Sequence, residues 1–280
     1  MPSSDEVETQ RRTPARERER EEGGRARGRA HELWVVVPAY NEEKSIGATL
    51  AALAGQRDRG FTVLVVDNAS TDRTAAIVRD FSAVHAELDI RLAGEPQKGT
   101  GTAADTGMRL AIEGGARLLA RTDADCLPDP EWVGAVRAAL ESGLELVTGR
   151  LLPRRDEFRL KTWERWLLPA VVSVAAAFGR FRPGNRDPAY QGPYIMCPGC
   201  NLGITAALYE RSGGFPRTAI EEEHEDRALV NRVRRVTSAY GHTRRMVVYG
   251  SVRRLRAYGL VQTLAWYADH RSRPAEVDIR

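Results

Sequence analysis

The sequence contains few cysteines: Cys126, Cys197 and Cys200 are the three thiols in 280 residues. Three thiols cannot build the paired disulfide framework of a small secreted domain. No secretory signal is recognisable at the start of the sequence, so we expect a reducing, cytoplasmic location. Zinc would need further soft ligands, and a redox Cys-x-x-Cys pair is expected near the first strand. The cysteines are therefore predicted to be packing residues.

Long apolar runs are also missing. The longest, from Trp166 to Phe178, is too short to cross a bilayer unaided. Its length is typical of a buried core helix, which is the favoured interpretation. The alternative is peripheral membrane contact, because Lys161, Arg165, Arg180 and Arg182 flank the run.

A strong net charge is absent as well. The formal net charge is +4 and no basic face is concentrated, so we expect no nucleic-acid partner. The content of 42% hydrophobic and 29% charged residues is that of a globular protein. Residues 1–30 carry almost no large apolar side chains, and this predicts a disordered charged tail followed by one folded domain over 31–280.

From residue 33 to 150, apolar β-rich runs alternate with segments of helical periodicity. This alternation predicts an α/β fold with a mostly parallel sheet and helices on both faces. The second half is less regular, with helices expected near 206–212 and 226–235. The expected strands are 33–37, 61–67, 90–94, 116–122 and 144–150, and the expected helices of this half are 42–55, 68–81, 108–115 and 130–143.

Two carboxylates, Asp123 and Asp125, follow the fourth expected strand at positions whose side chains face the same side. Ligands of open parallel sheets bind at the carboxyl ends of the strands, where the segment PAYNE and Asp67 are also expected. Hard carboxylate oxygens suit Mn²⁺ or Mg²⁺. The pair therefore predicts a site for a metal-bound nucleoside diphosphate, and the alternative is a solvated acidic turn.

Six segments of the chain resemble, in order, the inverting family-two glycosyltransferases of the GT-A fold. They are VVVPAYNEE, VLVVDNASTDRT, KGTGTAADTG, RTDADC, GCNLGITAALYERSGGFP and HEDRALVNRVRR, spanning roughly residues 33–256. The resemblance implies a nucleotide-binding half over 31–150 and an acceptor-binding half over 151–280. It also implies a nucleoside-diphosphate sugar donor, with a UDP-sugar favoured, and a hydroxyl acceptor.

The resemblance assigns roles to individual residues. It places Asp125 and Asp123 at the metal. The donor would be bound by Pro38, Tyr40, Glu42, Asp67, Lys98, Asp123, Gly199 and Asn201, with Arg253 and Arg254 at the diphosphate or on the surface.

Catalysis by this family needs a carboxylate that takes the proton of the acceptor hydroxyl. Asp226 is the first choice for this base and Glu225 the second. Acidic residues also suit a helix start, so the segment has a structural reading as well. Two residues depart from the usual family pattern. Cys126 follows the acidic pair where a polar residue is common, and Asp105 replaces the Asn expected in the glycine-rich block.

Two other enzyme classes and a non-catalytic binder compete with this interpretation. Gly99, Gly101 and Ala104 spell a G-x-G-x-x-A pattern typical of NAD(P)-binding oxidoreductases, but the segment EPQK separates them from their strand. A nucleotidyltransferase would also use paired carboxylates, although it usually has a basic, glycine-rich loop where PAYNEE is acidic. A non-catalytic binder would tolerate the loss of Asp226.

Overall fold

The computed structural model describes residues 31–154, 156, 185–217 and 225–253. The predicted tail 1–30, the run Trp166–Phe178 and Arg254 lie outside these residues. Within the described ranges, no helix has the length and apolar character needed to cross a membrane.

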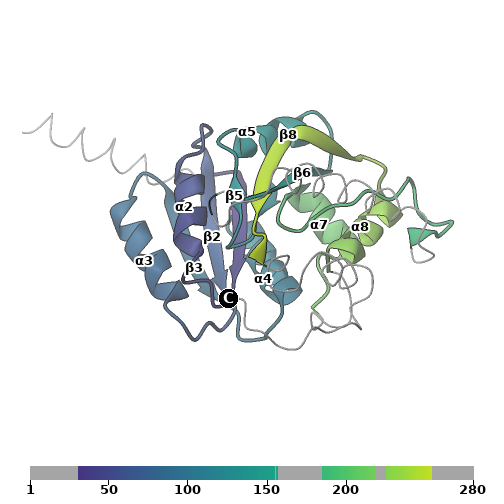
Figure 1. Cartoon of the computed structure of the whole chain (residues 1–280). Coiled ribbons are helices and arrows are strands. Elements are labelled where there is room, and N and C mark those ends of the chain that lie inside the picture. The colour runs from purple at the N-terminus through teal and green to yellow at the C-terminus, as the bar shows by residue number, and fades with distance from the viewer. Residues whose placement is uncertain (1–30, 155, 157–184, 218–224, 254–280) are drawn as a thin grey trace, which may run out of the picture.

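The described strands form one mixed sheet with the order β3-β2-β1-β4-β7-β6-β8-β5 (Figure 1). Strands β3, β2, β1 and β4 run parallel, whereas β7 is antiparallel to both of its neighbours. The strands are β1 Leu33–Ala39, β2 Phe61–Asp67, β3 Asp89–Gly94, β4 Leu118–Arg121, β5 Leu127–Pro128, β6 Leu146–Pro153, β7 Leu202–Thr205 and β8 Tyr240–Gly250.

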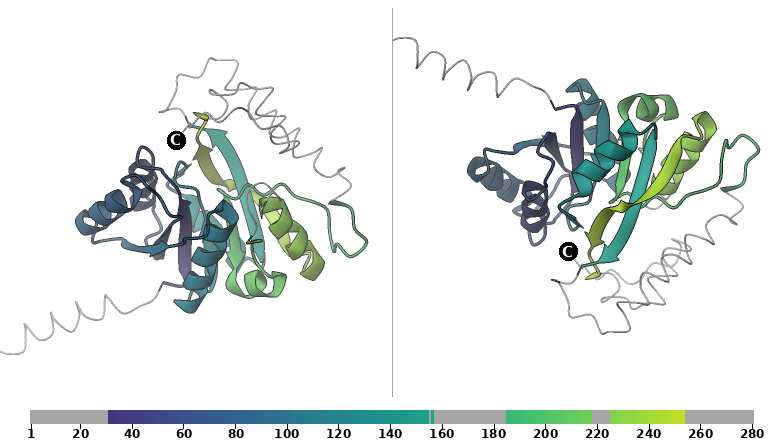
Figure 2. Two further views of the ribbon diagram at one scale, coloured as in Figure 1. Left: turned by 90° about the horizontal axis from the view of Figure 1, so that it is seen from below. Right: turned by 90° about the horizontal axis from the view of Figure 1, so that it is seen from above.

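Helices cover both faces of this sheet. One apolar core joins the strands to α2, α3 and α5, and a second joins the opposite face to α4, α7 and α8. In Figure 2, the purple-blue helices α2 and α3 and the green helices α7 and α8 lie on opposite sides of the strands. The helices are α2 Ile46–Ala54, α3 Thr74–Val84, α4 Thr100–Glu113, α5 Trp132–Glu141, α7 Ala206–Ser212 and α8 Glu225–Val236.

The apolar runs form the strands because both of their faces are buried. Every residue of β1 is buried, with Val35 and Val37 in one core and Trp34 and Val36 in the other. This two-sided burial explains why the predicted strands read as continuous rather than alternating patterns. The parallel arrangement predicted for the first half is confirmed.

The glycine-rich block differs from the prediction, because α4 begins at Thr100 and not near residue 108. Its glycines allow close packing inside the helix. A Cβ at Gly107 would collide with Val36 and Val66 of the sheet, and one at Gly101 would lie 2.9 Å from the Pro216 carbonyl oxygen. The dinucleotide-binding pattern is therefore not a strand-to-helix turn.

Candidate active site

The loops that follow β1 and β2 lie together at the carboxyl edge of the sheet and are held by mutual hydrogen bonds. Ala39 is in register with Asp67, so both strands end at the same level. Asn41 adopts a left-handed backbone (φ 53°), and its side-chain oxygen accepts the Thr71 N–H at 2.8 Å. The Glu42 N–H donates to Thr74 at 2.8 Å. These bonds tie the segment PAYNEE to the residues at the start of α3.

The predicted nucleoside-binding residues lie around these two loops. Pro38 is buried within β1. A buried side-chain oxygen of Asp67, Oδ1, has no hydrogen-bond partner among the described residues. Lys98 Nζ donates to the Tyr40 hydroxyl at 3.3 Å and lies 5.1 Å from the centre of the Tyr40 ring. Because a buried carboxylate oxygen rarely goes unpaired, Asp67 is available to a ligand donor.

A buried guanidinium, that of Arg121 at the end of β4, organises the second part of the site. It is 1% exposed, and its Nη2 lies 3.1 Å from Asp123 Oδ1 and 3.5 Å from Glu225 Oε1. Its Nη1 lies 3.7 Å from Asp226 Oδ1, and the Phe215 ring centre is 5.0 Å from Cζ. The adjacent carboxylates raise the pKa of Arg121 even though burial alone would lower it. Arg121 is thus a permanent cation among three carboxylates.

Arg121 had no predicted role. The available signal was a basic residue at the end of an apolar strand, directly before an acidic pair. A cation that is buried there needs carboxylate partners.

Asp226 lies at the start of α8, where it accepts the Gly199 N–H through Oδ2 at 2.8 Å. Its other oxygen, Oδ1, is buried and has no hydrogen-bond partner among the described residues. Burial and the neighbouring Glu225 carboxylate raise the pKa of Asp226 to about 7, against the opposing effect of Arg121. The side chain is therefore a carboxyl group that exchanges its proton near neutral pH.

Asp123 and Asp125 contact different arginines: Asp123 pairs with Arg121, and Asp125 pairs with Arg253. Burial raises the pKa of Asp123, and Arg121 opposes that rise. Asp125 Oδ2 accepts from Arg253 Nη2 at 2.9 Å, and the same nitrogen lies 3.0 and 2.9 Å from the two oxygens of Glu42. Arg253 therefore links the loop after β1 to the acidic pair.

The carboxylates suit a hard divalent cation in charge and in donor type. Asp123 and Asp125 are 33% and 27% exposed at their side chains, so both are accessible to a ligand. No group of three or more His, Cys, Asp and Glu side chains with metal-site geometry occurs in the described part of the chain. An ion held by Asp123 and Asp125 would need further oxygen ligands, such as those of a phosphate.

Gly199 and Asn201, although they lie two positions apart, have different surroundings. A Cβ at Gly199 would collide with Asp226 and would lie 2.8 Å from Arg121 Cζ, so this position needs glycine. Asn201 differs from the prediction that it contacts the donor. It is fully buried, accepts the Trp132 indole N–H at 2.8 Å and donates to the Arg150 carbonyl oxygen at 2.9 Å. Asn201 therefore joins α5 to the sheet.

The three cysteines are free and buried, in agreement with the predicted packing role. Burial raises the pKa of Cys197 to about 12. The thiol therefore stays protonated at neutral pH.

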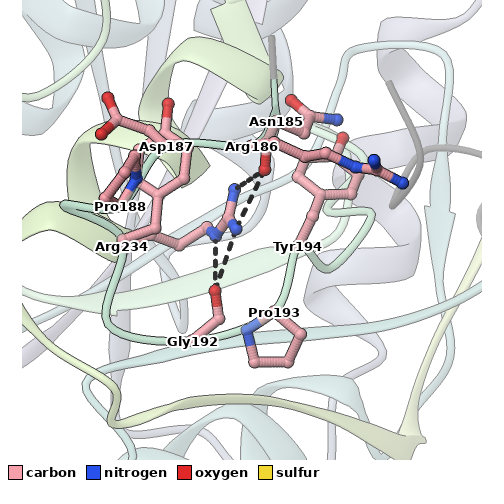
Figure 3. Close-up of a pocket in the computed structure, with 9 residues that line it drawn as sticks. Asn185, Arg186, Asp187, Pro188, Gly192, Pro193, Tyr194 and Arg234 are labelled. Atoms are coloured by element: carbon pink, nitrogen blue, oxygen red, sulfur yellow. Dashed lines mark hydrogen bonds between the residues drawn. The ribbon is translucent and has the colours of Figure 1, made fainter. Parts of the chain in front are cut away.

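A separate pocket of about 490 Å³ lies at the other end of α8 (Figure 3). Arg234 holds its wall by donating to the carbonyl oxygens of Asn185 and Gly192, and Tyr190 packs on the guanidinium at 4.1 Å. Arg234 follows Asp226 by eight helical residues, a rise of about 12 Å. This pocket is distinct from the carboxylate cluster.

Comparison with known proteins identifies the family. A family model described as glycosyl transferase family 2 matches residues 34–211, which include β1, the acidic pair and the segment around Gly199. This chain is a member of glycosyl transferase family 2. The predicted family and enzyme class are confirmed.

Two relatives carry the same activity in their names. An uncharacterized glycosyltransferase of Mycobacterium bovis is 37% identical over 182 residues, which are 65% of this chain and 74% of the relative. Glycosyltransferase AglE of Haloferax volcanii is 35% identical over 120 residues, which are 42% of this chain and 38% of AglE.

Solved structures of glycosyltransferases have the same GT-A fold. Mannosyltransferase PcManGT of Pyrobaculum calidifontis, in complex with GDP-Man and Mn²⁺, is 25% identical with a TM-score of 0.57, over 88% of this chain and 66% of that one. S. aureus TarS, in complex with UDP-GlcNAc, is 17% identical with a TM-score of 0.56, over 79% of this chain. This glycosyltransferase spans 58% of the TarS chain.

Proposed function

We propose that this glycosyltransferase moves a sugar from a nucleoside-diphosphate donor to an acceptor hydroxyl, with divalent-metal dependence and inversion of the anomeric centre. The observation that carries the proposal is the Asp226 carboxyl, anchored by Gly199, with a buried oxygen that accepts no hydrogen bond from the described residues and a pKa raised to about 7. A base with that pKa is ionised in part at neutral pH and still accepts a proton readily.

The proposed reaction begins when the acceptor hydroxyl attacks the anomeric carbon from the face opposite the diphosphate. Asp226 takes the hydroxyl proton, and Glu225 is the second candidate for that role. Arg121 keeps both carboxylates in place without entering the reaction, because it is buried and paired with both of them and with Asp123. Gly199 holds Asp226 in place through its backbone N–H, which donates to Asp226 Oδ2.

At the donor side, we propose that Asp67 accepts from the base and that Tyr40 and Lys98 flank the nucleoside. Asp125 and Asp123 would hold Mn²⁺ or Mg²⁺, whose charge offsets the charge that the departing diphosphate gains. Arg253, and Arg254 beyond the described residues, would approach the diphosphate. The GDP-Man and Mn²⁺ held by PcManGT support this arrangement, and a UDP-sugar remains the donor favoured by the sequence.

The proposal also includes the division into a nucleotide-binding half over 31–150 and an acceptor-binding half over 151–280. The pocket near Arg234 belongs to the second half. Cytoplasmic location with peripheral membrane contact is part of the same proposal.

A thermal-shift panel with two variants tests the function. UDP, GDP, dTDP, CDP and NADH are each measured with and without Mn²⁺, because a ligand that binds the folded state raises its melting temperature. We expect a Mn²⁺-dependent shift with one diphosphate, absent in Asp125→Ala and retained in Asp226→Asn. Release of nucleoside diphosphate from the matching nucleotide sugar should be lost in Asp226→Asn.

The matched control is Asp89→Asn, at the opposite end of the strands, whose side chain is 37% exposed against 36% for Asp226. It should retain both binding and turnover. Full turnover in Asp226→Asn would contradict the assigned base, and a shift with NADH alone would favour an oxidoreductase. Consumption of a nucleoside triphosphate with release of pyrophosphate would favour a nucleotidyltransferase.

A further inference from the structure

The position of Arg253 carries an inference about the order in which the ligands bind. Its guanidinium Nη2 contacts both oxygens of Glu42 and one oxygen of Asp125, all within 2.9–3.0 Å. Glu42 lies 211 positions before Arg253 in the sequence, and Asp125 lies 128 positions before it. The fold therefore brings three distant segments to one nitrogen. The three side chains are 14–27% exposed, which leaves the group accessible from solvent.

The Arg253 nitrogen supplies the positive charge that a bound cation would otherwise bring to the two carboxylates. Burial alone would lower the pKa of Arg253, but the Glu42 and Asp125 carboxylates outweigh it and raise the pKa, so the guanidinium stays charged. Without that charge, the two carboxylates would repel each other near an already acidic cluster. Without Arg253, Asp125 would have an oxygen to offer, beside Asp123, to a divalent ion.

We propose that Arg253 is an internal counter-ion that occupies Asp125 in the nucleotide-free protein and excludes a divalent cation until a diphosphate arrives. The incoming phosphate oxygens attract the guanidinium, whose planar N–H groups suit phosphate. Asp125 is then released to the metal. Metal and nucleotide therefore bind with positive coupling, each raising the affinity of the other.

Two features of the site support an exchange rather than a fixed ion pair. Arg253 is 18% exposed, whereas Arg121, which holds the neighbouring cluster, is 1% exposed. In addition, the described residues hold no preformed group of three metal-ligating side chains. A site with an incomplete ligand set and a competing cation has low affinity for the metal alone.

The experiment measures Mn²⁺ binding, by the loss of the free-ion electron paramagnetic resonance signal, in the presence and absence of UDP or GDP. This inference rests on the proposed metal role of Asp125. For the unmodified protein, we expect weak Mn²⁺ binding that strengthens when the preferred diphosphate is added. In Arg253→Gln, Mn²⁺ affinity without nucleotide should rise about tenfold, because a unit positive charge next to the ligand carboxylate is gone. The increase in Mn²⁺ affinity on adding diphosphate should be smaller in this variant than in the unmodified protein.

Arg137→Gln is the matched control. Arg137 is a 23% exposed arginine that binds the 22% exposed Asp58 at 2.7 Å, on α5 and away from the cluster. The Arg137→Gln substitution should leave Mn²⁺ binding unchanged. The double variant Asp125→Asn with Arg253→Gln should not show the increase in nucleotide-free Mn²⁺ affinity. That result would assign the increase to Asp125. Circular dichroism establishes that each variant is folded.

The outcomes separate this inference from the proposed function. Unchanged or weaker nucleotide-free Mn²⁺ binding in Arg253→Gln overturns the counter-ion role, while the proposed function stands if Asp125→Ala loses Mn²⁺-dependent nucleotide binding. If the unmodified protein binds diphosphate without any Mn²⁺ dependence, the metal role of Asp125 and the counter-ion role both fail.

Discussion

Arg121→Met is expected to destabilise the protein strongly, in a manner that depends on pH. The substitution keeps most of the side-chain volume and removes a cation that contacts Asp123, Glu225 and Asp226. It also removes the guanidinium that lies over the Phe215 ring. Three carboxylates would then face one another without compensation.

The magnitude follows from the burial of the group. Removing one partner of a buried ion pair costs about 3–5 kcal/mol. The partners of Arg121 are 19–36% exposed, so solvent screens part of the repulsion and we expect the low end, about 3 kcal/mol. For a chain of this size, that corresponds to a melting temperature lower by roughly 6–12 °C.

The direction of the pH dependence follows from the raised pKa values. Asp226 has a folded-state pKa of about 7, above the unfolded value near 4. The folded state therefore holds this proton more tightly, and stability falls as pH rises through that window. Without Arg121 the pKa values of Asp123 and Asp226 rise further. The deficit of the variant should be smallest near pH 5 and largest near pH 8.

Urea unfolding of both proteins at about pH 5 and pH 8 gives the two free energies of unfolding. Arg137→Gln serves as the control, because it removes a partly exposed arginine from an ordinary pair, and its deficit should depend little on pH. A deficit for Arg121→Met below about 1 kcal/mol at both pH values, or one that grows toward low pH, would refute this account of the cluster.

Two further predictions concern catalysis and the donor site. The pH profile of kcat/KM should fall on the acidic side with an apparent pKa near 7, because protonated Asp226 cannot accept the hydroxyl proton; a profile flat from about pH 5 to 8 would contradict its role as base. Asn201→Ala should lower the free energy of unfolding by about 2–3 kcal/mol, because it leaves Trp132 and a carbonyl oxygen unpaired in the core. Diphosphate affinity below the melting temperature should not change in Asn201→Ala, and a selective loss of affinity in a stable variant would restore the predicted donor contact.

The sequence allowed the parallel half of the sheet to be predicted because those strands are buried on both faces. Continuous runs such as residues 33–37 and 61–67 have no other reading once helical segments separate them. Strand β7 was missed for a physical reason. Its four residues, Leu202–Thr205, are stabilised by pairing with β4 and β6 from distant parts of the chain, and local pattern does not report such pairing.

Carboxylates at strand ends were predictable, whereas their partners were not. The position of Asp123 and Asp125 after an apolar run places them at the carboxyl edge in any parallel sheet. The contact of Arg253 with Glu42 depends on where β8 ends in the sheet, and the burial of Asn201 depends on α5 packing over β7. Family resemblance gave Gly199 and Asn201 the same expected role, and it did not separate Gly199, beside Asp226, from Asn201 in the core.

The two arginines of the site explain how one acidic region supports two different tasks. Arg121 is fully buried and contacts three carboxylates, so removing it from this cluster would be costly. The carboxylates near Asp226 therefore keep a constant electrostatic environment, as a proton acceptor requires. Arg253 is partly exposed, and its carboxylate partners are Glu42 and Asp125, so phosphate can replace these partners at little cost. The difference in burial between the two cations thus places proton transfer on the fixed side of the site and ligand exchange on the open side.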